Sequence, residues 1–198
     1  MRKLSIILVL LLVLSVSTAF ADHPAGWGVG ILGRGAWSYG YDGYGGLALS
    51  LKAPMLPVFW GLNLDFGVGH FGIGVTGDFY FIDMKIADFN GPNLGWYLGV
   101  GGYFTFSSRT GGHFDYNGRR RTASWTSLAL GARIPIGLSF QIPISAISLE
   151  IFAALIPNLG LGFWFWDSMY DDYWKDHDRG HVGFTGGVGG ELGVRVWF

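Results

Sequence analysis

The feature that most constrains this chain is a strict alternation of side-chain character, which is clearest over residues 182–198. Half of the odd positions there are glycine, and the others include Glu191 and Arg195. Successive side chains of a β-strand point to opposite faces. The segment is therefore predicted to be a strand with one face suited to lipid and the other small and polar. The even positions contain no polar residue: Val182, Phe184, Gly186, Val188, Gly190, Leu192, Val194, Val196 and Phe198.

Seven further segments alternate in the same way, and together they predict a barrel. A membrane-spanning strand needs about 9–11 residues, and bacterial single-chain barrels have an even number of strands. A soluble β-sandwich also alternates, but its exposed face would be rich in charge, and only 14% of this chain is charged. We predict an all-β, eight-stranded antiparallel up-and-down transmembrane β-barrel. The further segments are 27–34, 47–52, 60–66, 71–81, 95–106, 126–140 and 147–165.

Tryptophans near the expected strand ends support the same fold. Aromatic side chains form girdles at both membrane–water interfaces. We assign to these girdles Trp27, Trp37, Trp60, Trp96, Trp125, Trp164, Trp166 and Trp197.

The N-terminal stretch has the pattern of a signal peptide. Arg2 and Lys3 precede an apolar run over residues 4–16, and Ala19-Phe20-Ala21 is a small-x-small cleavage site. We expect residues 1–21 to be removed on export and residues 22–198 to form the barrel. The chain has no cysteine, so no disulfide contributes to its stability.

In a barrel with an even number of strands both termini lie on one side, which in the outer membrane is the periplasm. Periplasmic turns are then expected to be short and outer loops longer. We expect periplasmic turns at 53–57, 82–93 and 141–146. The outward connections are expected at 35–43, 67–70, 107–124 and 166–181.

The face predicted to point into the barrel collects four basic and four acidic side chains. Unpaired charges in a narrow lumen are costly, so these groups should pair with one another. They form either a polar plug that fixes the register or a gate in a narrow conducting path. The interior of an eight-stranded barrel is just wide enough for side chains, which favours the plug. The residues are Arg34, Lys52, Asp65, Asp78, Arg133, Glu150, Glu191 and Arg195.

Two of the predicted outer loops carry opposite charge. The loop at 107–124 is basic, and the loop at 166–181 is acidic and aromatic. The two loops either pair with each other or bind a host or environmental macromolecule, since exposed Tyr, Trp and Arg carry much interface energy. The binding candidates are Arg109, Arg119, Arg120, Arg121, Tyr170, Asp171, Asp172, Tyr173 and Trp174.

The sequence ends on Phe198, within the last predicted strand. We expect this strand to pair with the first strand, which removes both sheet edges. An alternating apolar last strand with a terminal Phe also resembles the signal that bacterial outer-membrane assembly machinery reads.

Four segments resemble a small spirochaetal outer-membrane protein family, described as OmpA- or OmpX-like eight-stranded barrels of unassigned function. They are "FGIGVTGDFYFID" (71–83), "GWYLGVGGYF" (95–104), "GARIPIGLSF" (131–140) and "GGELGVRVWF" (189–198). The resemblance implies the barrel fold and a bacterial outer-membrane location. It transfers no functional residue, because the loops of such proteins diverge most.

These observations predict a non-enzymatic surface protein whose barrel displays the loops 107–124 and 166–181. A narrow channel for water, ions or small solutes is the alternative, and a structural role in membrane integrity is a third reading. The expected partners are membrane lipid, the assembly machinery and an extracellular macromolecule, and nucleic acid is not expected. The sequence indicates no catalytic residue, metal ligand or cofactor.

Overall fold

The computed structural model describes residues 23–38, 44–114, 120–168 and 180–198, and its regular elements are all β-strands. Every pairing between them is antiparallel. Within the described residues, no helix is long and apolar enough to cross a membrane. The strands are β1 (Gly28–Ser38), β2 (Tyr44–Lys52), β3 (Phe59–Gly67), β4 (His70–Asp88), β5 (Asn93–Phe114), β6 (Arg120–Arg133), β7 (Ile136–Ile144), β8 (Ile147–Ser168) and β9 (Gly180–Trp197).

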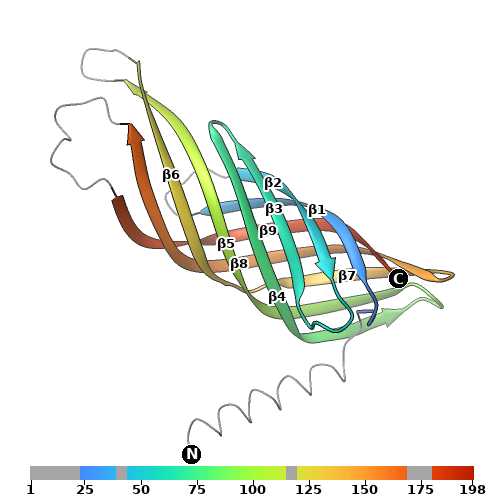
Figure 1. The fold of residues 1–198 in the computed structure, drawn as a ribbon. Helices are drawn as coiled ribbons and strands as arrows, with labels where there is room; N and C mark the ends of the chain where they lie inside the picture. Colours follow the sequence, from blue (N-terminus) through green and yellow to red (C-terminus); the bar gives the residue numbers. More distant parts are fainter. Residues whose placement is uncertain (1–22, 39–43, 115–119, 169–179) are drawn as a thin grey trace, which may run out of the picture.

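The strands close into a ring (Figure 1). The first strand pairs along its length with the last, and β4 pairs with β5 to complete the circle. The closure ends with two main-chain hydrogen bonds, from Trp27 N to Phe198 O at 2.8 Å and from Phe198 N to Trp27 O at 2.9 Å. The predicted pairing of the last strand with the first is thus confirmed, and it leaves the ring without an open edge.

One strand of the ring is divided into β6 and β7 by Ile134 and Pro135. Proline has no N–H to give to a ladder, so regular pairing stops there. The neighbouring strands bridge the gap, because Ile134 N donates to Pro157 O and Gly99 N donates to Pro135 O, both at 2.9 Å. With β6 and β7 counted as one, the nine strands make the predicted ring of eight.

Burial alternates along the strands as the sequence predicted. In β3, Asn63 and Asp65 are buried, whereas Leu62 and Leu64 are exposed. The outward face is apolar over most of the ring. Among the Lys, Arg, Asp and Glu side chains that the structure describes, the exposed ones are Lys85 and Asp88, close to the β4–β5 turn.

The strands run further than the sequence indicated. The connection predicted at 82–93 is wrong, because β4 continues to Asp88 and the turn is only 89–92, with positive φ at Asn90 and Gly91. Most of the loop predicted at 107–124 is also strand, since β5 and β6 pair up to Phe114 and Arg120. Three other connections are a few residues shorter than predicted. In the range 35–43, β1 continues to Ser38; in 141–146, β7 continues to Ile144; and in 166–181, β8 continues to Ser168 and β9 begins at Gly180.

The long hairpins make the two ends of the barrel different. Figure 1 shows β5–β6 and β8–β9 rising beyond β3–β4 at the end opposite the C-terminus. His70 of β4 pairs with Arg109 of β5, so β5 continues for residues 110–114 without β4 beside it. At about 3.4 Å per residue this is an overhang of roughly 17 Å along the strand.

A bulge in β4 changes which side chains point inward. The register with β5 shifts between Tyr80 and Ile82. Before the shift the even positions such as Asp78 are buried, and after it Asp83 is buried. Because one extra residue reverses the alternation, the bulge brings Asp83 into the lumen.

The prediction that the tryptophans form interfacial girdles agrees with the structure only in part. Trp27, Trp37 and Trp60 are exposed on the outer surface, whereas Trp96, Trp125 and Trp164 are half-buried. The assignment of Trp197 to a girdle is wrong, because its side chain is 1% exposed and lies inside the barrel. Its odd position in β9 points it inward, where its indole N–H bonds to Glu150. The side chain of Trp166 lies outside the described part.

Candidate functional site: the barrel lumen

Arg133 is the centre of the ion pairs in the half of the lumen nearer the long hairpins. Its Nε lies 3.0 Å from Oδ1 of Asp78, and its Nη2 donates to Oε1 of Glu191 at 2.9 Å. The three residues come from β6, β4 and β9, so the contacts join strands that are not neighbours in the ring. Nearby, Arg34 Nε lies 3.5 Å from Oδ1 of Asp65.

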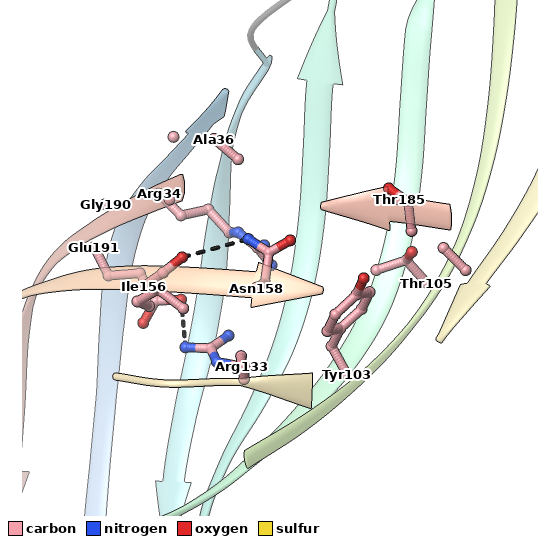
Figure 2. A pocket seen from close by; sticks show the side chains of 13 residues that line it. Arg34, Ala36, Tyr103, Thr105, Arg133, Ile156, Asn158, Thr185, Gly190 and Glu191 are labelled. Atoms are coloured by element: carbon pink, nitrogen blue, oxygen red, sulfur yellow. Dashed lines mark hydrogen bonds and ion pairs between the residues drawn. The ribbon is translucent and has the colours of Figure 1, made fainter. Parts of the chain in front are cut away.

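A cavity of about 80 Å³ lies beside these pairs. Figure 2 shows Arg34, Arg133 and Glu191 at the cavity together with Tyr103 and Asn158. A second cavity of about 20 Å³, lined in part by residues of β3, β4 and β9, lies further along the lumen. Buried water needs about 10–15 Å³ of such space per molecule. This half of the lumen therefore has room for a few waters.

The other half, toward the chain termini, is organised around Glu150 of β8, whose side chain is fully buried. Its Oε2 accepts hydrogen bonds from Arg195 Nη1 and from Trp197 Nε1, both at 2.7 Å. Arg195 also donates to Ser50 Oγ from Nη2 at 2.9 Å. Glu150 therefore ties β8 to β9, and Arg195 extends the network to β2.

His23 completes this network from outside the strands. Its Nε2 is 2.9 Å from Oε1 of Glu150, and its Nδ1 is 2.7 Å from Oδ1 of Asp83. Its main-chain N donates to the other oxygen of Asp83 at 3.1 Å. Burial lowers the pKa of His23, but the charge of Glu150 and the contacts with Asp83 outweigh it and raise the pKa to about 9. The ring is then an imidazolium at neutral pH.

Aromatic rings fill the space around these charges. Tyr80 stacks on Phe59 and on Tyr97, with ring centroids 4.2 and 4.4 Å apart. The Arg195 guanidinium lies over Phe152 at 4.5 Å and over Phe59 at 4.9 Å. Tyr97, Phe152 and Trp197 are nearly inaccessible to solvent. This layer of rings and ion pairs closes the lumen near the termini.

A glycine on the inward face makes room for one of these rings. A Cβ at Gly193 would lie 2.7 Å from both Phe152 Cζ and the main-chain oxygen of Ile31. No real side chain tolerates such contacts without movement of its neighbours. Here an inward glycine accommodates a large ring instead of leaving space for water.

The structure brings seven of the eight predicted lumen residues into the ion pairs described above. Lys52 is the exception, since its Nζ donates to the main-chain oxygen of Ala53 at 2.8 Å and lies 5.7 Å from the centroid of Phe59. His23 and Asp83 were missed. His23 precedes the first alternating segment, and Asp83 is placed inward by a bulge that alternation alone does not show.

Three of the nine loop candidates lie in strands rather than in a loop. Arg109 lies in β5 with its guanidinium 5.7 Å from the Trp125 ring centroid. Arg120 and Arg121 are strand residues of β6, opposite Phe114 and His113. The other candidates lie outside the described residues: Arg119, Tyr170, Asp171, Asp172, Tyr173 and Trp174. Within the described ranges, no group of three or more His, Asp or Glu side chains is arranged to hold a metal ion.

Comparisons with known proteins find outer-membrane barrels among solved structures. No family model matches the chain. No curated protein matches it significantly. The N-terminal β-barrel domain of OprF from Pseudomonas aeruginosa is similar at 12% identity and a TM-score of 0.39, over 84% of this chain and 96% of that chain. A major outer membrane protein from Thermus thermophilus is similar at 15% identity and a TM-score of 0.34, over 85% of this chain and 100% of that chain. The spirochaetal family that the sequence resembles is not among these findings.

Proposed function

We propose that this chain is a non-enzymatic outer-membrane barrel that is closed to solutes and displays its long hairpins at the cell surface. The observation that carries the proposal is the contrast between the ends of the barrel. Buried rings and ion pairs around Glu150 fill the lumen near the termini. At the other end, β5–β6 and β8–β9 extend past their neighbours (Figure 1).

The outer surface supports a membrane location. Large apolar side chains such as Leu47, Leu155 and Leu192 are each more than 60% exposed on outward positions. Apolar surface of this extent is costly in water and suits the hydrocarbon of a bilayer. In this proposal residues 1–21 are the signal peptide, both termini are periplasmic, and the strand ending at Phe198 is read by the assembly machinery.

The closed layer supports this proposal over the channel alternative. A conducting path would have to cross the level of Glu150, which is 0% exposed, and Tyr97, which is 2% exposed. The cavities further along the lumen hold about 80 and 20 Å³. They are small voids, which suits a barrel that serves as a scaffold.

Single cysteines test the proposed orientation, since the chain has none of its own. Val68 in the β3–β4 turn and Met55 in the β2–β3 connection are 99% and 94% exposed at opposite ends of the barrel. In intact cells a membrane-impermeant maleimide should label Val68→Cys and leave Met55→Cys unlabelled until the outer membrane is permeabilised. The reverse pattern, or equal labelling of both, would contradict surface display of the long hairpins.

The basic hairpin indicates the chemistry of a partner. Arg119, Arg120 and Arg121 are consecutive in the sequence, and such a basic run suits an acidic macromolecule such as a sulfated polysaccharide. Heparin-agarose is a suitable probe. The wild-type protein should be retained, and replacement of the three arginines by serine should lower the salt needed for elution, whereas replacement by lysine should not. No retention of the wild type would favour pairing between the basic and acidic hairpins instead.

A further inference from the structure

His23 is held in the barrel in the way a ligand is held in a binding site. It lies before β1, and the side chains around its ring come from five different strands. Its imidazole is nearly inaccessible to solvent, with a side-chain exposure of 3%. The surrounding groups are Phe59 of β3, Tyr80 and Asp83 of β4, Tyr97 of β5, Glu150 of β8 and Trp197 of β9.

Two buried carboxylates select a cation with two N–H groups. Asp83 and Glu150 approach different ring nitrogens of His23 at 2.7 and 2.9 Å. A neutral imidazole has only one N–H, so it cannot donate to both ionised carboxylates, whereas an imidazolium can. Glu150 also accepts from Arg195 and Trp197, which are the contacts expected of an ionised carboxylate.

Four aromatic rings surround the imidazole of His23. The centroid of the His23 ring lies 5.2 Å from Phe59, 5.6 Å from Tyr80 and 5.6 Å from Tyr97. The Trp197 ring lies at 5.9 Å. Aromatic rings attract cations at separations of up to about 6 Å. The planes of these rings lie at 51–71° to the imidazole plane, so the rings enclose the cation from several sides while the carboxylates approach its N–H edges.

From this arrangement we propose that the terminal end of the lumen is a binding cage for a small planar organic cation, an imidazolium or a guanidinium, and that the protein fills it with its own His23. The inference goes beyond the scaffold role, because it assigns a ligand chemistry to the lumen. The cation cage consists of Phe59, Tyr80, Asp83, Tyr97, Glu150 and Trp197.

A cavity provides access to the cation cage. It has a volume of about 320 Å³ and is lined by His23 and Asp83 together with the chain segments around Pro24 and Met55. A small cation that reaches this cavity needs only to replace the His23 ring. The tether to β1 gives His23 a high effective concentration, so a free cation competes poorly while His23 is present.

Removal of the tethered ligand tests the cage directly. The full chain carrying His23→Ala is compared with the wild type and with His181→Ala, which removes an exposed histidine. Imidazole at pH 6 should raise the thermal unfolding midpoint of His23→Ala by several degrees in a concentration-dependent manner. It should leave the wild type and His181→Ala unchanged. A midpoint of His23→Ala that does not respond, or an equal response in all three proteins, overturns the proposal.

Two further comparisons test the chemistry of the cage. The double variant His23→Ala/Asp83→Asn should lose most of the response to imidazole. Methylguanidinium at millimolar concentration should stabilise His23→Ala, whereas tetramethylammonium, which is not planar and has no N–H, should not. Equal effects of the two cations would show that charge alone matters and would contradict the cage.

The test remains decisive if His23→Ala does not fold by itself. The yield of folded protein is then measured with and without imidazole during refolding, and an increase confined to His23→Ala supports the cage, whereas no increase overturns it. In the wild type, nuclear magnetic resonance of histidine labelled with ¹⁵N gives a second readout. At pH 7 both ring nitrogens of His23 should carry protons, and a neutral ring would contradict the proposal.

Discussion

At the residue scale, the charge on His23 links the stability of the barrel to pH. Contacts with Glu150 and Asp83 raise the pKa of His23 from 6.5 to about 9 despite its burial. A raised pKa means that the stabilisation is complete below pH 6.5 and is lost as the pH rises through 9. At about 1.4 kcal/mol per pKa unit, the loss is on the order of 3 kcal/mol.

This dependence is measured as the thermal unfolding midpoint in detergent at pH 6 and pH 9.5. The titratable groups that face His23 are Asp83 and Tyr80 of β4, Tyr97 of β5 and Glu150 of β8, with Arg195 behind Glu150. The wild type should lose stability across this interval, and His23→Gln, which cannot carry the charge, should lose much less. Equal losses in the two proteins would show that another group is responsible.

Gly193 tests whether the lumen is closed by tight packing. A Cβ at this position would meet Leu32 Cβ at 2.6 Å and Phe152 Cζ at 2.7 Å. Gly193→Ala should therefore destabilise the barrel by about 1–3 kcal/mol, the usual cost of overpacking. In Gly190→Ala on the same strand, the new Cβ has no neighbour nearer than 3.9 Å, so the free energy of unfolding should hardly change. A harmless Gly193→Ala would mean that the lumen has spare room.

Most of the lumen residues were predictable because a strand has a period of two. Asp65, Asp78 and Arg195 stand on the small, polar side of their segments and are buried. The same reasoning missed Asp83, which a bulge reorients, and His23, which belongs to no strand. The ion-pair partner of each charged side chain could not be predicted from the sequence either, because pairing across the lumen depends on how the whole ring closes.

At the scale of elements, the overhang of the β5–β6 hairpin should be dispensable for folding. Thr110 pairs with Ser124, and β4 begins at His70, which pairs with Arg109. Replacing residues 111–123 by an Asn-Gly turn keeps every rung that joins β5 to β4. The unfolding midpoint should then stay close to that of the wild type, because only rungs within the hairpin are removed.

A deletion of residues 104–130 is the matched control. It removes six rungs between β4 and β5 as well as the overhang, so the ring is weakened and the unfolding midpoint should fall well below that of the wild type. An equal fall after the replacement of residues 111–123 would show that the overhang is part of the barrel rather than an appendage.

The strand ends were the least predictable elements. Segments such as 107–114 and 120–124 are rich in Gly, Ser, Thr and Arg, which is typical of a loop. They are strands because each has the other as an antiparallel partner. The turn predicted at 82–93 exists, but it is confined to residues 89–92, and the preceding residues 82–88 belong to β4. Composition indicates where a chain is polar, whereas pairing decides where a strand ends.

At the scale of the molecule, the barrel is closed by packed side chains at one end and extended by long hairpins at the other. The seal at the closed end consists of groups from β2, β3, β4, β5, β8 and β9 together with His23. It therefore holds the ring together across its diameter, as a sealed scaffold requires. The sequence predicted the ring and its polar interior, but the seal depends on His23 and on rings that meet only after closure.

The most direct test of a sealed barrel is the conductance of the full, folded protein in a planar bilayer. Circular dichroism and heat-modifiable migration in electrophoresis first establish that the protein is folded, and a porin of known conductance serves as the positive control. A sealed lumen predicts a silent membrane at all salt concentrations. Discrete conductance steps that grow with salt concentration would contradict the sealed lumen and would favour a channel.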